Sequence, residues 1–182
     1  KGGIIMAKFK IVTDSGCDLS KELINNYNIE VIPIPVQMGE KEYKDREDID
    51  PKTFYAQLEE FEGRPTTSQI APYTFKQRFS KLLEEHKYLF YISFSSQLSG
   101  IYNSAKTAQN LIDVDADRIT VIDSRAASLG QGLIAIKARE FVEENTSLEE
   151  LIKKIKKVRD EMYHIFRVGS LKMLKKGGRI SS

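Results

Sequence analysis

The amino-acid sequence predicts an α/β fold in which a mainly parallel β-sheet is flanked by helices. Short apolar or β-branched runs alternate along the chain with longer segments whose apolar residues recur at helical spacing, which is the pattern of β-α-β units. The composition, with 41% hydrophobic and 30% charged residues in a chain of 182, is typical of a globular protein that can bury a core.

Each element is predicted from its own pattern. Segments that are short and β-rich predict strands at 8–15, 29–38, 87–93, 117–124 and 163–170, with a turn and a further short strand at 38–43. Segments with helical periodicity or a capping residue predict helices at 19–27, 51–61, 72–86, from after 100 to about 111, and at 126–145, 147–162 and 171–178.

Proline and aspartate give the sharpest local signals. Asp50 followed by Pro51 is a strong helix start, because the carboxylate can cap the helix and proline suits its first position. Pro33 and Pro35 cannot donate hydrogen bonds to a strand ladder. We therefore expect segment 29–38 to lie at a sheet edge or in an irregular connection.

Charge distribution divides the chain into two parts. Segment 153–179 has ten Lys or Arg residues against two acidic ones, whereas the whole chain has a net charge of +2, so the remainder is net acidic. The balance changes near Asn145, and we expect a first α/β lobe at 6–145 and the beginning of a second, truncated lobe at 146–182. Residues 1–5 resemble vector-derived sequence, and the chain stops in a glycine-rich loop, which indicates a fragment.

Composition and motifs argue against several function classes. One cysteine, Cys17, rules out an internal disulfide and fits a reducing cytoplasm, where we expect the protein to reside. No apolar run is long enough to cross a bilayer, so we expect no stable membrane insertion. The acidic segment 45–50 lacks calcium-loop spacing, no phosphate-binding glycine motif is present, and aromatic residues are not interleaved with basic ones. We therefore expect no metal, no cofactor and no nucleic acid.

Hydroxyl-rich loops follow three of the predicted strands, and a fourth such loop precedes a helix. They are TDSGCD at 13–18, SFSSQLSG at 93–100, DSRAAS at 123–128 and RPTTSQ at 64–69. Ligands of parallel sheets bind beyond the carboxyl ends of the strands, and helix N-termini present unpaired N–H groups to anions. These loops therefore indicate a seat for a carboxylate or a phosphate, although Ser95, Ser96 or Ser99 could instead only cap the following helix.

A serine hydrolase is the enzymatic alternative. A nucleophile at Ser95, Ser96 or Ser99 needs a base within hydrogen-bond reach. The only histidines, His86 and His164, stand at a charged helix end and at the start of a predicted strand, and the chain has no Gly-x-Ser-x-Gly elbow. These observations disfavour hydrolysis.

A third possibility is a docking module. The basic segment from Lys153 to Arg179 could bind an acidic protein or an anionic membrane. The alternative interpretation of the same charges is a solvated helix face. Salt-dependent association with anionic vesicles would favour docking.

Five motifs occur in a fixed order over nearly the whole chain. They are IVTDSGCDL, RPTTSQ, ISFSSQLSGIYNSA, VIDSRAASLGQG and LKKGGRIS. This ordered set resembles the DegV family of bacterial fatty-acid-binding proteins. The resemblance implies two lobes with a long-chain fatty acid in a tunnel between and within them. It also implies a non-catalytic protein that presents the carboxylate to a separate ATP-dependent fatty acid kinase, whose acyl-phosphate product enters phospholipid synthesis.

The resemblance also assigns the residues that hold the carboxylate. Its ligands would be Thr67 and Ser96, with the backbone N–H of Gln97 as a third donor. The residues that would shape the seat are Ser68, Ser95 and Gly100. Arg179, in GGRIS, would lie near the head group or the kinase.

The sequence departs from the family pattern next to two of these loops. Ile101 stands where threonine is usual, and Ile70 and Ala71 stand where proline and serine are usual. Neither change removes a proposed donor, but both bear on the shape of the tunnel. Since each buried methylene contributes about 0.8 kcal/mol, the tail supplies most of the affinity, and we expect 182 residues without the rest of the tunnel wall to bind fatty acid weakly.

Overall fold

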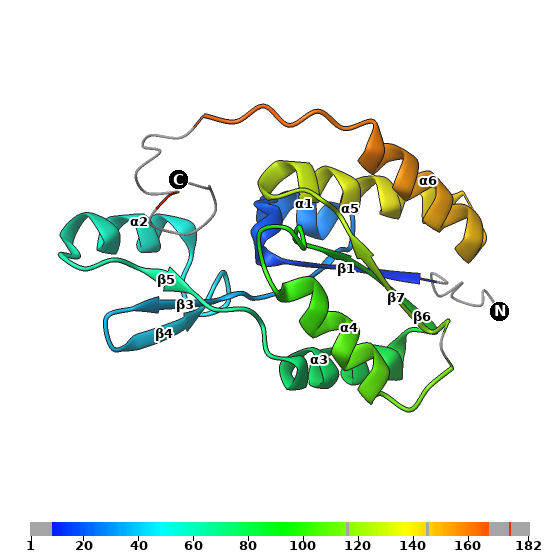
Figure 1. The fold of residues 1–182 in the computed structure, drawn as a ribbon, viewed down its shortest axis with the longest axis horizontal. Coiled ribbons are helices and arrows are strands. Elements are labelled where there is room, and N and C mark those ends of the chain that lie inside the picture. The colour runs from blue at the N-terminus through cyan, green and yellow to red at the C-terminus, as the bar shows by residue number, and fades with distance from the viewer. Residues whose placement is uncertain (1–8, 116, 145, 168–174, 176–182) are drawn as a thin grey trace.

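The computed structural model describes residues 9–115, 117–144, 146–167 and 175. Its centre is a four-stranded parallel sheet in the order β2-β1-β6-β7 (Figure 1). The strands are β1 (Phe9–Asp14), β2 (Glu30–Ile32), β6 (Tyr88–Ser93) and β7 (Ile119–Asp123). The predicted α/β class with a parallel sheet is thereby confirmed.

Helices cover both faces of this sheet, as Figure 1 shows. On one face pack α3 (Pro72–Glu85) and α4 (Ile101–Leu111), and on the other α1 (Lys21–Asn26), α5 (Ser128–Glu143) and α6 (Leu148–Asp160). Alternating strand residues supply the two cores. One core includes Val12, Leu89, Tyr91, Ile119 and Val121, and the other includes Phe9, Ile11, Phe90, Ile92 and Ile122.

Local capping accounts for several helix starts. Asp50 accepts hydrogen bonds from the N–H groups of Lys52 and Thr53 at 3.0 and 3.1 Å, and Pro51 occupies the first turn of α2 (Pro51–Glu60). The sequence allows Thr146 or Ser147 as the cap of α6; Ser147 caps it, whereas the Thr146 hydroxyl donates to the Phe141 carbonyl. These starts were predicted, because a cap and its helix lie within a few residues of one another.

The predicted strand at 29–38 is divided between two sheets. Its first part is β2, whereas β3 (Pro35–Met38) belongs to a separate antiparallel sheet in the order β4-β3-β5. The other strands of that sheet are β4 (Lys41–Lys44) and the two-residue β5 (Thr66–Thr67). Pro33 and Pro35 flank the division, which agrees with the irregular connection that these prolines predict.

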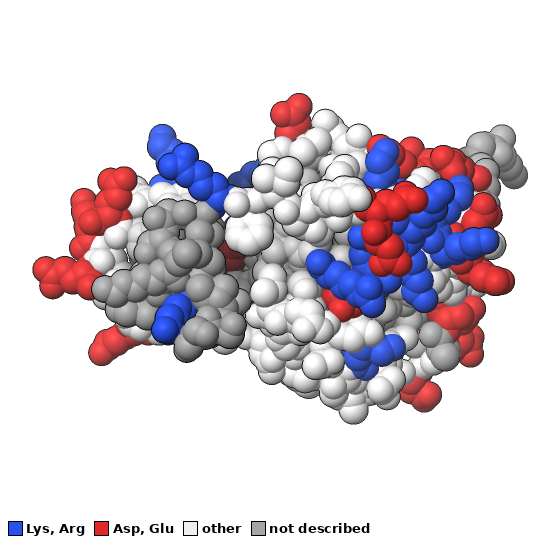
Figure 2. Space-filling view, turned by 45° about the horizontal axis from the view of Figure 1, so that its top comes forward, with Lys and Arg blue, Asp and Glu red and all other residues white. Residues whose placement is uncertain are grey.

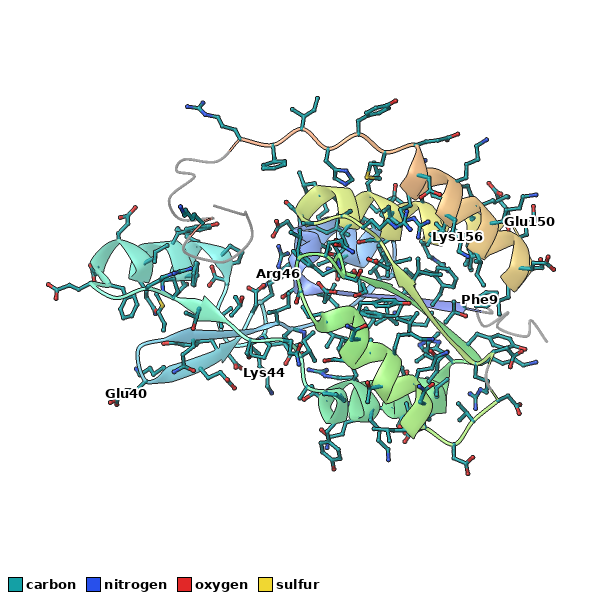
Figure 3. The ribbon with its side chains drawn as sticks, viewed as in Figure 1. Phe9, Glu40, Lys44, Arg46, Glu150 and Lys156 are labelled. Carbon is teal, nitrogen blue, oxygen red and sulfur yellow. The ribbon has the colours of Figure 1, made fainter. Side chains whose placement is uncertain are left out.

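Arg46 lies at the junction between the two sheets, whereas Glu40 lies at the far tip of the β3–β4 hairpin (Figure 3). The Arg46 guanidinium donates to the Leu19 carbonyl oxygen and lies 3.5 Å from the Asp18 carboxylate. Both partners belong to the loop that follows β1. The second sheet is therefore tied to the carboxyl edge of the first.

One predicted strand is wrong within the part that the structure describes. Residues 163–167 form no strand, and the side chains of Tyr163, Ile165 and Phe166 are 93%, 99% and 78% exposed. The segment has the β-rich composition of a strand but pairs with no other strand among the described residues. Most of the predicted strand beyond 167 and of the helix at 171–178 lies outside those residues.

The predicted boundary near Asn145 falls between α5 and α6, which pack together on the same face of the sheet. The antiparallel sheet comes instead from residues 35–67, within the predicted first lobe. A second lobe beginning at 146 therefore stays a prediction. No helix in the described part of the chain is long and apolar enough to cross a membrane.

β7 is an outer strand of the parallel sheet, and a groove of about 560 Å³ runs along it between α4 and α6. The N–H of Leu89 donates to Arg118 O and that of Ser124 to Ser93 O. Residues 119, 121 and 123 therefore direct their backbone groups away from β6. The Ile119 carbonyl accepts from the Gln109 side chain at 2.6 Å, and the Asp123 carbonyl from Arg159 at 3.4 Å.

Cys17 is fully buried in the turn after β1, and burial raises the pKa of its thiol to about 11. Because the thiolate is the reactive form, we expect a disulfide reagent to label the folded protein at pH 8 far more slowly than the protein in denaturant. The measurement is the rate of absorbance change on reaction with dithionitrobenzoate. Equal rates in the two conditions would contradict the buried placement.

Candidate functional site

Three hydroxyl-rich loops meet at the carboxyl edge of the parallel sheet. The backbone N–H of Phe94 donates to Asp14 Oδ2 at 2.9 Å, which joins the loop after β6 to the end of β1. The N–H of Ser95 donates to the Ala126 carbonyl at 2.9 Å, which joins the same loop to the one after β7. The convergence expected for parallel strands is therefore present.

Asp14 is the buried centre of this junction. Its carboxylate also accepts hydrogen bonds from the Tyr91 hydroxyl at 2.8 Å and from the Gly16 N–H at 3.2 Å. Burial raises the pKa of the Asp14 carboxyl, and the hydrogen bonds from the Phe94 N–H and the Tyr91 hydroxyl oppose that shift. The carboxylate thus orders the loops from inside the protein and has no exposed surface for a ligand.

A second buried network supports the same region. The Gln131 side chain of α5 donates to Thr13 Oγ1 at 2.9 Å and, at 3.3 Å, to the Ile92 carbonyl, which also accepts from the Thr13 hydroxyl. Gln131 is fully buried, and its Oε1 has no hydrogen-bond partner among the residues that the structure describes. These contacts hold the start of α5 against the ends of β1 and β6.

Ser96 is bound by a carboxylate of the protein itself. Its hydroxyl donates to Asp123 Oδ2 at 2.6 Å, and its backbone N–H donates to Asp123 Oδ1 at 3.1 Å. The N–H of Arg125 donates to the same Oδ1 at 3.0 Å. Asp123 therefore fixes the position of the serine that sequence analysis selected.

Ser95 and Gln97 interact with each other beside Ser96. The Ser95 side chain is buried, with 4% of its surface exposed, and its hydroxyl accepts from the Gln97 N–H at 3.3 Å. At that length the bond is weak. The Gln97 N–H, the third donor expected from sequence analysis, is therefore only weakly occupied within the protein.

Thr67 and Ser68 lie on the other side of the site, at and just after β5, and both are exposed. A Cβ atom built on Gly100 would overlap Gln69 Oε1. The 64–69 loop therefore reaches the start of α4, next to the loop that holds Ser96. A side chain at position 100 would require the exposed Gln69 side chain to move away from the start of α4.

Two helices begin at this site without side-chain caps. Gly100 precedes α4 and Ala127 precedes α5, and neither supplies a capping oxygen. The Ile101 N–H at the start of α4 donates to Ser99 Oγ at 3.4 Å, a length at which the bond is weak. Both helix starts still attract an anion through their N-terminal N–H groups. Arg125 and Ser128 have φ angles of 52° and 54°, which is a strained backbone for residues other than glycine, and such strain is frequent at binding sites.

The alternative functions find less support in this geometry. The partner of the Ser96 hydroxyl is a carboxylate, and no histidine in the described ranges hydrogen-bonds to Ser95, Ser96 or Ser99. No group of three or more His, Cys, Asp or Glu residues that could hold a metal ion is found among the described residues. On α6, Lys154 and Lys157 form ion pairs with acidic neighbours, so basic and acidic side chains are intermixed on that face (Figure 2).

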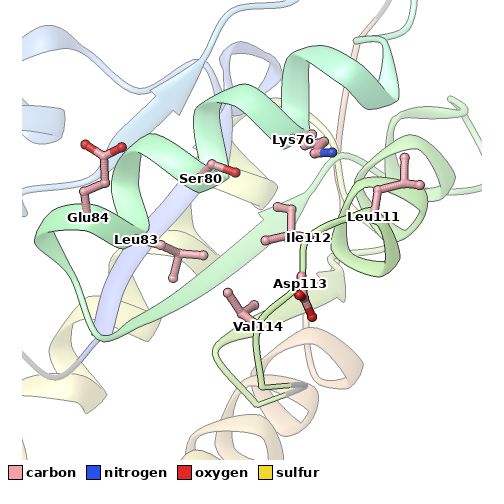
Figure 4. Close-up of a pocket in the computed structure, with 8 residues that line it drawn as sticks. All are labelled: Lys76, Ser80, Leu83, Glu84, Leu111, Ile112, Asp113 and Val114. Carbon is pink, nitrogen blue, oxygen red and sulfur yellow. The ribbon is translucent and has the colours of Figure 1, made fainter.

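A further cavity, of about 400 Å³, lies between α3 and the end of α4 (Figure 4). Its lining includes Leu83, Leu111 and Val114. Because α4 has 11 residues, its far end is about 16 Å from the hydroxyl loops. This cavity is therefore separate from the candidate site.

The fold and the sequence match one protein family over nearly all of the chain. The family model described as an uncharacterised protein of the DegV family matches residues 8–182. The chain belongs to the DegV family. Curated DegV domain-containing proteins of Clostridium perfringens and Caldanaerobacter subterraneus are 40% and 39% identical to it, each over 97% of this chain and 62% of the relative.

Solved DegV structures have the same fold. A DegV protein from Thermus thermophilus, described as binding fatty acid, superimposes with a TM-score of 0.84 at 34% identity, over 94% of this chain and 60% of that protein. DegV from Bacillus subtilis, described as a fatty acid binding protein, has a TM-score of 0.84 at 29% identity, over 94% and 61%. The chain thus spans about three fifths of the length of these DegV proteins.

Sequence analysis of this DegV chain selected loops that the structure brings together, but it missed residues that organise them. Asp123 stands in the quoted motif VIDSRAASLGQG, and its place at the end of a strand was the available signal. Asp14 and Gln131 were not selected, because their partners are distant in sequence. Arg179, proposed near the head group, lies outside the described residues.

Proposed function

We propose that this protein binds a long-chain fatty acid and holds its carboxylate among the hydroxyl loops at the carboxyl edge of the parallel sheet. The observation that carries the proposal is the meeting of the 64–69 and 94–100 loops at the start of α4, where the cap position is Gly100 and has no side chain. Thr67, Ser96 and the Gln97 N–H are the proposed donors. The residues that shape the seat in this proposal are Ser68, Ser95 and Gly100.

The described functions of solved relatives support this choice of anion. Both DegV proteins compared above are described as binding fatty acids. Exposed leucines next to the loops fit an apolar tail: Leu98, Leu129 and Leu133 are 39%, 63% and 46% exposed. A phosphate would gain nothing from these side chains, whereas a fatty acid buries both its tail and their surface.

The carboxylate and the apolar tail of a fatty acid contribute different amounts to its binding free energy. Each hydrogen bond to the carboxylate contributes about 1.5–3 kcal/mol, and a helix N-terminus about 0.3–1 kcal/mol. A tail of a dozen methylenes contributes about 10 kcal/mol, at about 0.8 kcal/mol each, which is several times the contribution of one such hydrogen bond and exceeds that of the three proposed bonds together. The hydroxyl seat therefore sets orientation and discriminates against esters, while the tunnel supplies affinity.

We further propose that the protein is a cytoplasmic carrier without catalytic activity of its own. It presents the carboxylate to a separate ATP-dependent kinase, which forms the acyl-phosphate. In this proposal the second lobe begins near residue 146, and Arg179 contacts the head group or the kinase. ATP-dependent acyl-phosphate formation by a bacterial fatty acid kinase, with and without this protein, tests the partnership.

We expect sodium octanoate to shift backbone amide signals of the 64–69 and 94–100 loops in NMR titrations of the chain. Octanoate is soluble enough to reveal weak binding. The double variant Thr67→Val/Ser96→Ala removes two hydrogen bonds and should weaken binding by at least about a hundredfold.

The matched control is Thr66→Val/Ser99→Ala, which removes the same two hydroxyl types from neighbouring positions. Successive strand side chains point to opposite faces, so Thr66 should not contact the ligand. The control should bind as the parent does. Unchanged binding in the first variant would show that the site assignment is wrong.

A further inference from the structure

The Ser96 hydroxyl has a single proton, and Asp123 already accepts it. The distance from Ser96 Oγ to Asp123 Oδ2 is 2.6 Å, whereas Oδ1 accepts from the N–H groups of Ser96 and Arg125 at 3.1 and 3.0 Å. Each oxygen of Asp123 is therefore a hydrogen-bond acceptor. A carboxylate ligand at Ser96 would also need to accept that same hydroxyl proton.

Two carboxylates cannot both accept from one hydroxyl proton. We propose that a carboxylate ligand binds at Ser96 together with one proton, which the ligand, Ser96 and Asp123 share. The inference rests on the proposed function, because it requires the ligand head group to contact Ser96. It adds Asp123 as a positioning residue that makes binding depend on pH.

The proton balance is simple. The free ligand is an anion, and the added proton comes from water. When Ser96 donates its hydroxyl proton to the ligand, the added proton lies between Asp123 Oδ2 and Ser96 Oγ. Only O–H bonds are exchanged, and the complex has the same net charge as the free protein.

The charged groups around Asp123 come from α4, from α6 and from the segments before and after β7. Arg159 of α6 donates to its backbone carbonyl, and Lys156 of α6 and Lys106 of α4 line the adjoining groove. The Arg125 guanidinium, in the loop after β7, lies 3.6 Å from the Asp160 carboxylate. Asp117 lines the same groove near the start of β7. These neighbours persist when Asp123 alone is replaced, so a change in pH dependence can be attributed to Asp123.

The test measures octanoate affinity of the chain by NMR between about pH 6 and pH 8, where the free ligand is ionised. Because binding takes up one proton, the affinity of the parent protein for octanoate should fall by up to about tenfold for each unit by which the pH rises. In Asp123→Asn the side-chain amide can donate to Ser96 Oγ, so Ser96 can donate to the ligand without an added proton. Its affinity should be independent of pH and should exceed that of the parent at pH 8.

Asp160→Asn is the matched control, since it removes a carboxylate from the same surface without touching Ser96. It should keep the pH dependence of the parent. Calorimetric titration of the parent in two buffers of different ionisation enthalpy measures proton uptake without any variant. A buffer-dependent heat corresponding to one proton is the expected result.

Three outcomes would overturn the inference. Parent affinity that does not change with pH would show that Ser96 turns from Asp123 to the ligand without a proton. If the octanoate affinity of Asp123→Asn changed with pH as steeply as that of the parent, the proton would bind at a group other than Asp123. Absence of octanoate binding at every pH would remove the proposed function as well, whereas the first two outcomes would leave fatty acid binding intact.

Discussion

Replacing Asp14 with alanine should lower the free energy of unfolding by about 2–6 kcal/mol. The change leaves two buried donors, the Tyr91 hydroxyl and the Phe94 N–H, without their acceptor. Each unsatisfied buried group costs about 1–3 kcal/mol. Urea unfolding followed by circular dichroism measures the loss, and a loss below about 1 kcal/mol would contradict the role of Asp14 as the acceptor that joins the loops.

Asp14→Asn separates the charge from the hydrogen bonds. Burial raises the pKa of folded Asp14 above its unfolded value of about 3.9. The stability that this group contributes is therefore complete below the unfolded pKa and is lost as the pH rises through the folded pKa. Asparagine does not titrate, so the stability of the Asp14→Asn variant relative to the parent should increase as the pH is raised from about 4. A constant difference across that range would contradict the shifted pKa.

Gly132→Ala should destabilise the protein although alanine favours helices. A Cβ atom at position 132 would lie 2.7 Å from the backbone carbonyl oxygen of Cys17 and 2.6 Å from Leu19 Cδ2. The turn after β1 must then move, and overpacking of this kind costs about 1–3 kcal/mol. Alanine gains about 1 kcal/mol in helix propensity over glycine. This gain is smaller than the overpacking cost except at the low end of that cost. Thermal unfolding monitored by circular dichroism gives the change.

Gly130→Ala is the matched control on the same helix. Its Cβ would lie 2.9 Å from Nε2 of the exposed His164 side chain, which can move aside. The substitution should be neutral or should raise stability by up to about 1 kcal/mol. If both variants lost stability equally, close packing of Gly132 on the turn would not be the cause.

The sequence predicted the elements whose determinants are local. Asp50 and Pro51 mark the start of α2 within one turn of the chain, and the structure confirms them. The predicted helix start at 147 is also confirmed, and of its two possible caps, Thr146 and Ser147, the structure has Ser147. Strand pairing depends on distant residues. This is why the two-residue β5 was missed and why residues 163–167, which resemble a strand in composition, form none in the described structure.

In the candidate site, too, features with local determinants could be predicted and contacts between distant residues could not. Its loops could be found because each follows a strand and is rich in hydroxyl groups. The role of Asp123 could not be predicted, because its bonds to Ser96 span 27 positions of the sequence. Gln69 was also missed, since its contact with Gly100 depends on how the antiparallel sheet is placed.

The outer strand β7 bears on the behaviour of the protein at high concentration. Unpaired strand edges are templates for intermolecular sheet growth and aggregation. Here the outward carbonyls of Ile119 and Asp123 are taken by side chains of α4 and α6, and only Val121 between them keeps its outward carbonyl free of a partner in the described structure. With two of the three outward carbonyls occupied, another chain could form only an incomplete ladder at this edge. Protection against self-association at this edge is therefore supplied by the flanking helices, through Gln109 and Arg159.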